Sequence, residues 1–181
     1  MRLIKEQKGS VLIELAVAIP LLVTLLFSGL EVARFMLTHQ KVARIATSVA
    51  DISSQGQTIS EAEIANVFDA TEFVAGSLNF STDGYMILTS VSRDGANNPA
   101  VEWQRTHGTQ ISAETISKVG VPGGTATIPS NFVLEAGEGL IIAEVYYDYS
   151  ALLFGDIVGD GLIYKTAYYR PRFGALQQVL P

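Results

Sequence analysis

The chain contains 181 residues, which is enough for one folded domain and one additional element. It has no cysteine, and this excludes disulfide bonds, thiolate zinc sites and cysteine nucleophiles. Asp and Glu (18) outnumber Lys and Arg (12), so the net charge of −6 would repel the phosphate backbone of a nucleic acid. We therefore expect no nucleic-acid partner.

A long apolar run begins close to the N-terminus. Residues 11–30 contain one charged side chain, Glu14, and one strong helix breaker, Pro20. As a helix, this run would extend about 30 Å, the thickness of the hydrocarbon core of a bilayer. A cleaved secretory signal has a shorter apolar region that ends at a small-residue cleavage site. The run therefore predicts a single membrane-spanning helix in contact with the lipid bilayer.

The basic residues on either side of the run indicate its orientation. Three of them precede it and three follow it: Arg2, Lys5, Lys8, Arg34, Lys41 and Arg44. The preceding three form the tighter cluster next to the membrane edge. The positive-inside rule therefore favours a cytoplasmic N-terminus, with the rest of the chain outside the cytoplasm.

Glu14 and Pro20 are both unfavourable in a membrane helix. An acidic side chain at the centre of a bilayer costs roughly 2.5–3.5 kcal/mol. Cleavage between Gly9 and Ser10 would create an α-amino group four residues before Glu14, which could pair with the carboxylate of a neighbouring copy. Pro20 lacks a backbone donor and its ring clashes with the carbonyl of Ala16, so we expect a kink or local loosening there.

Beyond the run, apolar residues continue at helical spacing. They form one stripe: Val32, Phe35, Met36, His39, Val42, Ala43, Ala46, Val49 and Ala50. Leu37, Ile45 and Ile52 lie off this stripe and make a second, weaker apolar surface. We predict one helix over residues 10–53, followed by a polar linker over residues 53–58 and a head domain over residues 59–181.

The head has the signals of an α+β fold. Ser60 and Glu63 form a capping box at the start of a helix whose apolar face includes Ile64, and Gly76 can end that helix. Alternating apolar residues predict strands at 85–91, 100–105, 140–149 and 162–169, with a turn at 94–99. A short helix is expected at 111–119. The result is an antiparallel sheet of about four strands beside one or two helices.

No pattern in the chain indicates catalysis, a cofactor or a metal. His39 and His107 lack companion ligands at workable spacing. Asp156 and Asp160 lack the acidic ladder and the closing Glu of a calcium loop, and are read as part of a polar turn. The chain has no nucleophile elbow, zinc-protease helix or phosphate-binding loop. We therefore expect no enzymatic activity and no cofactor.

A cluster of tyrosines leaves two readings open. Tyr146, Tyr147, Tyr149, Tyr168 and Tyr169 lie on two predicted strands. They can pair across the strands and complete the sheet, which we favour, or form an adhesive or subunit-facing surface.

Several of these features together carry a resemblance. Lys8-Gly9-Ser10 followed by Glu14 resembles the processing site of the type IV pilin superfamily. The run from Glu14 to Leu22 with Gly29-Leu30-Glu31 and Arg34 is similar to the TadE/TadF-like minor pilins of the tight-adherence (Tad) pilus. Three head segments agree: Trp103-Gln104-Arg105, Ala143-Glu144-Val145-Tyr146-Tyr147-Asp148-Tyr149 and Arg170-Pro171-Arg172. The chain departs from many type IV pilins at Ser10, where those have an aromatic residue, and its head is larger than that of the major Tad pilins.

The resemblance implies specific roles for residues and partners. Residues 1–9 would be a leader that a prepilin peptidase removes after Gly9. Glu14 would pair with the Ser10 amine of an adjacent subunit and set the register, and Pro20 would soften the helix for extraction from the bilayer. Glu31 and Arg34 are spaced to pair on the helix surface.

The implied function is that of a minor pilin, or pseudopilin, required for Tad pilus assembly, surface adhesion and biofilm formation. Its partners would be other minor and major pilins and the assembly platform of the inner membrane. The alternative is an extracytoplasmic binding or sensor domain for which the helix is only a tether.

Overall fold

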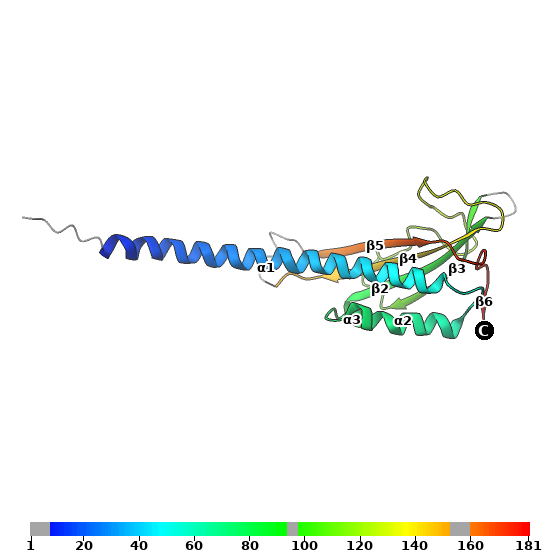
Figure 1. Ribbon diagram of the computed structural model, residues 1–181, viewed down its shortest axis with the longest axis horizontal. Coiled ribbons are helices and arrows are strands. Elements are labelled where there is room, and N and C mark those ends of the chain that lie inside the picture. The colour runs from blue at the N-terminus through cyan, green and yellow to red at the C-terminus, as the bar shows by residue number, and fades with distance from the viewer. Residues whose placement is uncertain (1–7, 94–97, 153–159) are drawn as a thin grey trace, which may run out of the picture. The chain divides into compact units, whose positions relative to one another are not determined.

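The computed structural model describes residues 8–93, 98–152 and 160–181 (Figure 1). Its elements in chain order are α1 (Lys8–Ser53), β1 (Ile59–Ser60), α2 (Glu61–Ala75), α3 (Phe80–Asp83), β2 (Gly84–Arg93), β3 (Pro99–Gly108), β4 (Gly139–Tyr149), β5 (Gly161–Tyr169) and β6 (Val179–Leu180). The predicted α+β fold is confirmed: a long apolar helix precedes four antiparallel strands in one sheet and short helices. Residues 94–97 of the predicted turn, and Asp156, lie outside the described residues.

The chain divides into two compact units. The first comprises Met1–Leu37 and Ser150–Asp160, and the second comprises Thr38–Tyr149 and Gly161–Pro181. The first unit thus contains the apolar part of α1 and residues of the β4–β5 connection. The second contains the end of α1, the sheet and the remaining helices.

In the second unit, the last part of α1 is buried along one side. The buried residues recur every three or four positions: Thr38, Val42, Ile45, Ala46, Val49, Ala50 and Ser53. The placement of Ile45 off the main stripe was wrong, because Ile45 is 0% exposed. The prediction treated residues 32–50 as one face, whereas Val32 and Met36 are exposed and belong to the first unit. The helix nevertheless ends at Ser53, as expected.

Helix α2 begins with the predicted capping box. The Ser60 hydroxyl accepts a hydrogen bond from the backbone N–H of Glu63 (3.2 Å), and Ser60 N–H donates to Glu63 Oε2 (2.7 Å). The helix ends at Gly76, whose φ of +62° favours glycine and whose N–H donates to the Glu72 carbonyl. The buried face is Ile64, Val67, Phe68, Thr71 and Ala75. Both ends of this helix were therefore readable from the sequence.

We expect Ser60→Ala to lower the free energy of unfolding by about 1 kcal/mol, because the backbone N–H of Glu63 loses its acceptor. Urea unfolding followed by fluorescence of Trp103 measures this change, since the chain has a single tryptophan. Ser130→Ala, at an exposed loop position, is the control and should stay within about 0.5 kcal/mol of the parent. Equal stability of the two variants would contradict a role for the capping box.

The four-stranded sheet has the order β3-β2-β4-β5, and each neighbouring pair is antiparallel. The register of β2 against β3 shifts between Ser90 and Val91. A separate two-stranded parallel pair joins β1 to β6. This pair and the four-residue helix α3 were not predicted, because elements of two to four residues are too short to show a periodic pattern.

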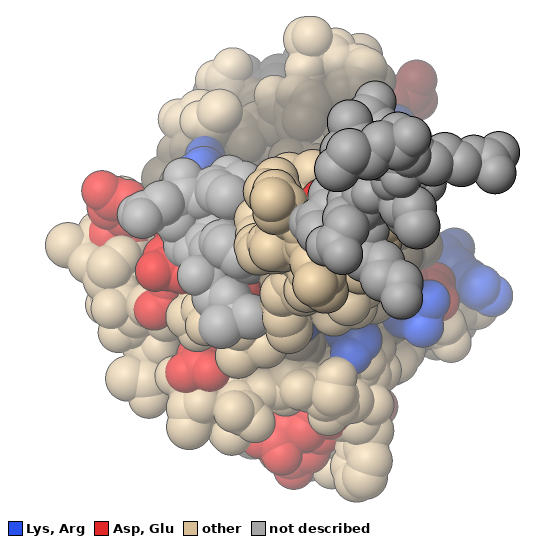
Figure 2. Space-filling model, turned by 90° about the vertical axis from the view of Figure 1, so that its left-hand side faces the viewer, with Lys and Arg blue, Asp and Glu red and all other residues tan. Residues whose placement is uncertain are grey.

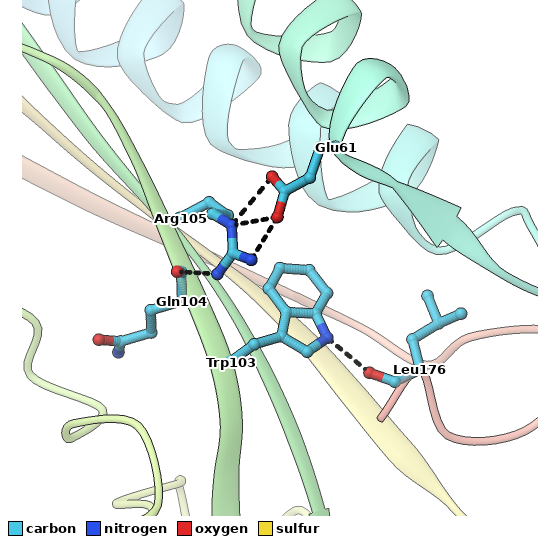
Figure 3. A network of polar contacts seen from close by, with 5 residues as sticks. All are labelled: Glu61, Trp103, Gln104, Arg105 and Leu176. Carbon is cyan, nitrogen blue, oxygen red and sulfur yellow. Dashed lines mark hydrogen bonds and ion pairs between the residues drawn. The ribbon is translucent and has the colours of Figure 1, made fainter. Parts of the chain in front are cut away.

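One face of the sheet is covered by α2. The carboxylate of Glu61 accepts two hydrogen bonds from Arg105 Nε (2.9 and 3.0 Å) and another from Arg105 Nη2 (Figure 3). The hydrogen bonds from Arg105 hold the pKa of the Glu61 carboxyl below its usual value. Farther along α2, the ring of Phe68 stacks on His107 with centroids 5.1 Å apart. His107 therefore has a packing role at the end of β3.

The C-terminal segment reaches the same face of the sheet. Trp103 Nε1 donates to the carbonyl of Leu176 (2.8 Å), and the Ser90 hydroxyl donates to the same oxygen (2.6 Å; Figure 3 shows the Trp103 bond). Leu176 is buried. The adjacent strands β2 and β3 thus both bind the C-terminal segment through the backbone carbonyl of Leu176.

The opposite face is covered by the long connection between β3 and β4, residues 109–138, which contains no helix or strand. The predicted helix at 111–119 was wrong. Here side chains compete with helical hydrogen bonding: the hydroxyl of Thr115 donates to the Ser112 carbonyl (2.6 Å), and Ser112 Oγ accepts from Glu114 N–H (3.2 Å). An apolar cluster packs beneath the connection: Val91, Val101, Val119, Ala126, Leu134, Leu140 and Ile142.

The central strands of the sheet are buried because both faces of the sheet are covered. Ten of the eleven residues of β4 are buried, with Asp148 the exception. Tyr146, Tyr147 and Tyr149 are among the buried residues, which supports the packing interpretation of the tyrosine cluster for these three. The rings of Tyr146 and Tyr164 lie 4.7 Å apart across β4 and β5.

Candidate functional site

The predicted cleavage and assembly residues all lie on α1. The helix begins at Lys8, so Gly9 and Ser10 are in its first turn. Glu14 follows one turn later and is exposed. Among the described residues, no hydrogen bond or ion pair to the Glu14 carboxylate is present. In a single copy of the chain, this carboxylate is therefore accessible to a partner group from outside.

The apolar part of α1 is exposed over almost its entire length. Its large side chains from Val11 to Leu30 are 40–70% exposed. The helix containing this run has a mean hydropathy of 2.5 in its most apolar stretch, and none of that stretch is buried within the chain. By length and composition the helix can cross a membrane, and it suggests a single-pass anchor.

Pro20 lies inside this exposed run. Helix α1 continues through it as one element of 46 residues. Proline has no N–H, so the carbonyl of Ala16 lacks its usual helical donor. One turn later the Thr24 hydroxyl donates to the Pro20 carbonyl (2.9 Å). The helix is therefore weakened by one backbone hydrogen bond at this position without being interrupted.

Glu31 is the first residue after the apolar run, and it is only 2% exposed. Its Oε1 atom lies 3.4 Å from Arg34 Nη1, one helical turn away. Both carboxylate oxygens also accept the backbone N–H of Leu152, at 3.1 and 3.2 Å. Glu31 thus contacts the β4–β5 connection, 121 positions later in the chain.

A second carboxylate closes the base of the same connection. Asp160 Oδ1 accepts the backbone N–H of Ala151 (2.6 Å). Two consecutive amides, those of Ala151 and Leu152, are therefore held by the carboxylates of Asp160 and Glu31. From the sequence, Asp160 was predicted to be a polar turn residue and Glu31 to pair with Arg34 alone. The contact with Leu152 had no local signal, because its two residues are distant in sequence.

A different buried carboxylate, Glu144 of β4, was also missed. It is 0% exposed and accepts three hydrogen bonds: from the Ser117 hydroxyl (2.5 Å), the Lys118 N–H (2.8 Å) and the Tyr164 hydroxyl (2.8 Å). The Lys118 ammonium lies 3.8 Å from the centroid of the Tyr164 ring. Glu144 thus holds the β3–β4 connection on the sheet.

This cluster perturbs two phenols in the direction expected for buried tyrosines. Burial and the nearby Glu144 carboxylate raise the pKa of Tyr146 to about 12, and its hydroxyl donates to the Ile116 carbonyl (2.6 Å). Burial and the hydrogen bond to Glu144 also raise the pKa of Tyr164. Both phenols therefore remain protonated donors at neutral pH, a structural role rather than that of a general base.

Charged side chains do not converge on a chemical centre elsewhere. Across residues 8–93, 98–152 and 160–181, no group of three or more His, Asp or Glu side chains is arranged to hold a metal ion. Figure 2 shows Asp and Glu at several separate places on one face of the molecule, with Lys and Arg gathered mainly on one side of it. The exposed apolar helix with Glu14 is therefore the feature that most clearly calls for a functional explanation.

Comparison with known families supports this choice. Residues 9–51 match the model of the family described as TadE-like protein, the resemblance predicted from the sequence. No curated protein and no solved structure matched the chain. The match covers the segment with Gly9, Ser10, Glu14, Pro20, Glu31 and Arg34. This family is structural rather than enzymatic, and it suggests association with the Tad pilus. Over residues 9–51, the chain is therefore similar to TadE-like proteins.

Proposed function

We propose that the protein is a membrane-inserted minor pilin needed for assembly of a Tad-type pilus. One observation carries the proposal: α1 exposes a membrane-length apolar run with an accessible carboxylate, Glu14, within the TadE-like segment. An apolar surface of this length must be covered by lipid or by other subunits. A pilin meets both conditions, because it resides in the membrane before assembly and packs against other pilins afterwards.

In this proposal, residues 1–9 are a leader, residues 10–53 a stalk helix and residues 59–181 an extracytoplasmic head. A prepilin peptidase at the inner membrane reads Gly9, whose lack of a side chain permits close approach of the protease backbone. The cut produces the α-amino group of Ser10. This amine then pairs with Glu14 of an adjacent subunit in the apolar filament centre, where an unpaired charge is strongly disfavoured.

The remaining roles follow from the same assembly. Pro20 weakens α1 by one hydrogen bond within the membrane and so eases extraction of the helix. The partners are the prepilin peptidase, other minor and major pilins, the inner-membrane assembly platform and the lipid bilayer. The N-terminus is cytoplasmic before cleavage. The head contributes to surface adhesion and biofilm formation when the protein is part of an extracellular pilus.

The processing step is tested by replacing Gly9. We expect Gly9→Leu to remain uncleaved, because a branched side chain obstructs the approach of the peptidase. Mass spectrometry of the mature N-terminus measures the result: Ser10 for the parent and Met1 for the variant. Gly29→Ala is the matched control, since an added Cβ at Gly29 has no heavy atom within 4 Å.

The same measurement separates the pilin from a simple membrane tether. A tether keeps Met1 at its N-terminus in the parent chain as well. Normal cleavage of Gly9→Leu at Ser10 would contradict the proposed processing site. Failure of Gly29→Ala to be cleaved would instead point to a general effect of substitutions in α1.

A further inference from the structure

The edge of the apolar run is joined to a distant loop. Glu31 immediately follows Leu30, the last residue of the run, and its buried carboxylate accepts the N–H of Leu152 in the first unit of the chain. Arg34 Nη1 lies beside the same carboxylate, while its side chain remains 45% exposed. The charge of Glu31 is thus compensated by a backbone amide and a guanidinium rather than by lipid or water.

Exposed apolar residues lie next to this contact along the chain. Leu152 is 68% exposed although its backbone is fastened to α1. Phe27 lies one turn before Glu31 on the same helix side and is exposed, as are Leu30 and Val32. We call Phe27, Leu30, Val32 and Leu152 the apolar collar.

The position of the collar matches the boundary of a bilayer. Residues 11–30 extend about 30 Å, whereas a bilayer with its headgroup regions is about 40–45 Å thick. Glu31 and the backbone of Leu152 therefore fall at the start of the headgroup region when α1 spans the membrane. Backbone groups in the adjoining hydrocarbon core need partners within the protein, and at its edge Glu31 supplies an acceptor for the N–H of Leu152.

We propose that Glu31 fastens the start of the β4–β5 connection to α1, and that the resulting apolar collar rests in the interfacial layer of the lipid bilayer. The inference depends on α1 spanning the membrane, as in the proposed function. The occupant is lipid because the collar is continuous with the exposed apolar run. Arg34, whose side chain is 45% exposed, can then direct its guanidinium toward the lipid phosphates while its methylenes stay in the apolar layer.

The absence of cysteine from the chain allows a direct test. Leu152→Cys in the full-length protein is labelled with an environment-sensitive fluorophore and placed in vesicles of phosphatidylcholine and phosphatidylglycerol. Some vesicles carry a nitroxide near the headgroup and others carry it deep in the acyl chains. We expect the shallow nitroxide to quench the label more strongly than the deep one. A label at Leu22→Cys, in the middle of the run, should show the opposite order.

The role of Glu31 is tested in the Leu152→Cys background. Glu31→Ala should lose most of the quenching by the shallow nitroxide, because the amide of Leu152 loses its acceptor. Glu31→Gln should restore part of it, since its amide oxygen can still accept a hydrogen bond. Glu72→Ala, at an exposed position of α2, is the control and should leave the quenching unchanged.

The outcomes distinguish failure of the collar from failure of the membrane anchor. If Leu22 is not quenched by the deep nitroxide, α1 does not span and the proposed function fails with the collar. If Leu22 is quenched but Leu152 is not, the collar alone is overturned. A blue-shifted Leu152 label that neither nitroxide quenches would show that a protein surface covers this site, which also overturns the collar.

Discussion

Glu14→Ala is expected to prevent incorporation of the protein into pili while leaving it in the membrane. The Ser10 amine of an adjacent subunit would lose its partner in an apolar environment, and breaking one side of a buried ion pair costs roughly 3–5 kcal/mol. Insertion should be unchanged or improved, because an acidic side chain within the hydrocarbon core is costly, by up to roughly 2.5–3.5 kcal/mol at its centre. Assembly should therefore fall while insertion does not.

Assembly is measured as the fraction of the protein in sheared pili, and insertion as resistance to extraction at alkaline pH. Glu14→Gln keeps a polar side chain without the charge, so its assembly should also be impaired. Glu72→Ala removes an exposed carboxylate on α2 and should leave both measurements unchanged. Normal incorporation of Glu14→Ala into pili would rule out the intermolecular pair.

Glu144→Ala is expected to produce the largest loss of stability in the head. The substitution leaves the Lys118 N–H and the Ser117 and Tyr164 hydroxyls without their acceptor beneath the β3–β4 connection. Each unsatisfied buried donor costs about 1–3 kcal/mol, so the free energy of unfolding should fall by roughly 3–5 kcal/mol even though a buried charge is removed. Glu144→Gln retains an acceptor oxygen and should lose less.

Urea unfolding followed by Trp103 fluorescence reports this change, because Trp103 lies in β3 of the same sheet. Glu114→Ala, in the same connection but exposed, is the matched control and should change stability by no more than about 0.5 kcal/mol. If Glu144→Ala is as stable as Glu114→Ala, the connection is held mainly by its apolar cluster and Glu144 is dispensable.

The regular elements were largely predictable because their signals are local. The capping box at Ser60 and the helix end at Gly76 depend on residues within one or two turns of each other, and the structure contains both. The four predicted strands are present, each within three residues of its expected bounds. These segments show alternating apolar residues in the sequence, even though both faces of the sheet are covered in the structure.

The errors arose where distant contacts decide the conformation. The segment 111–119 has helix-forming residues, but Glu144 on β4 holds its backbone in an irregular path. Ile45 was assigned to a secondary surface because spacing alone cannot show where one compact unit ends and the next begins. In both cases tertiary packing overrode a local preference.

The sequence by itself determined the apolar run, the position of Glu14 five residues after Gly9, the antiparallel strands and the similarity to TadE-like proteins, because each depends on neighbouring residues. Only the tertiary structure decided the distant partners of Glu31 and Glu144. The amide of Leu152 lies 121 positions from Glu31, and the three donors to Glu144 lie 20 to 27 positions from it. Such contacts leave no periodic pattern in the sequence. They form because folding places backbone amides and hydroxyls, which need acceptors, beside these carboxylates. The buried carboxylates are therefore visible only after the chain has folded.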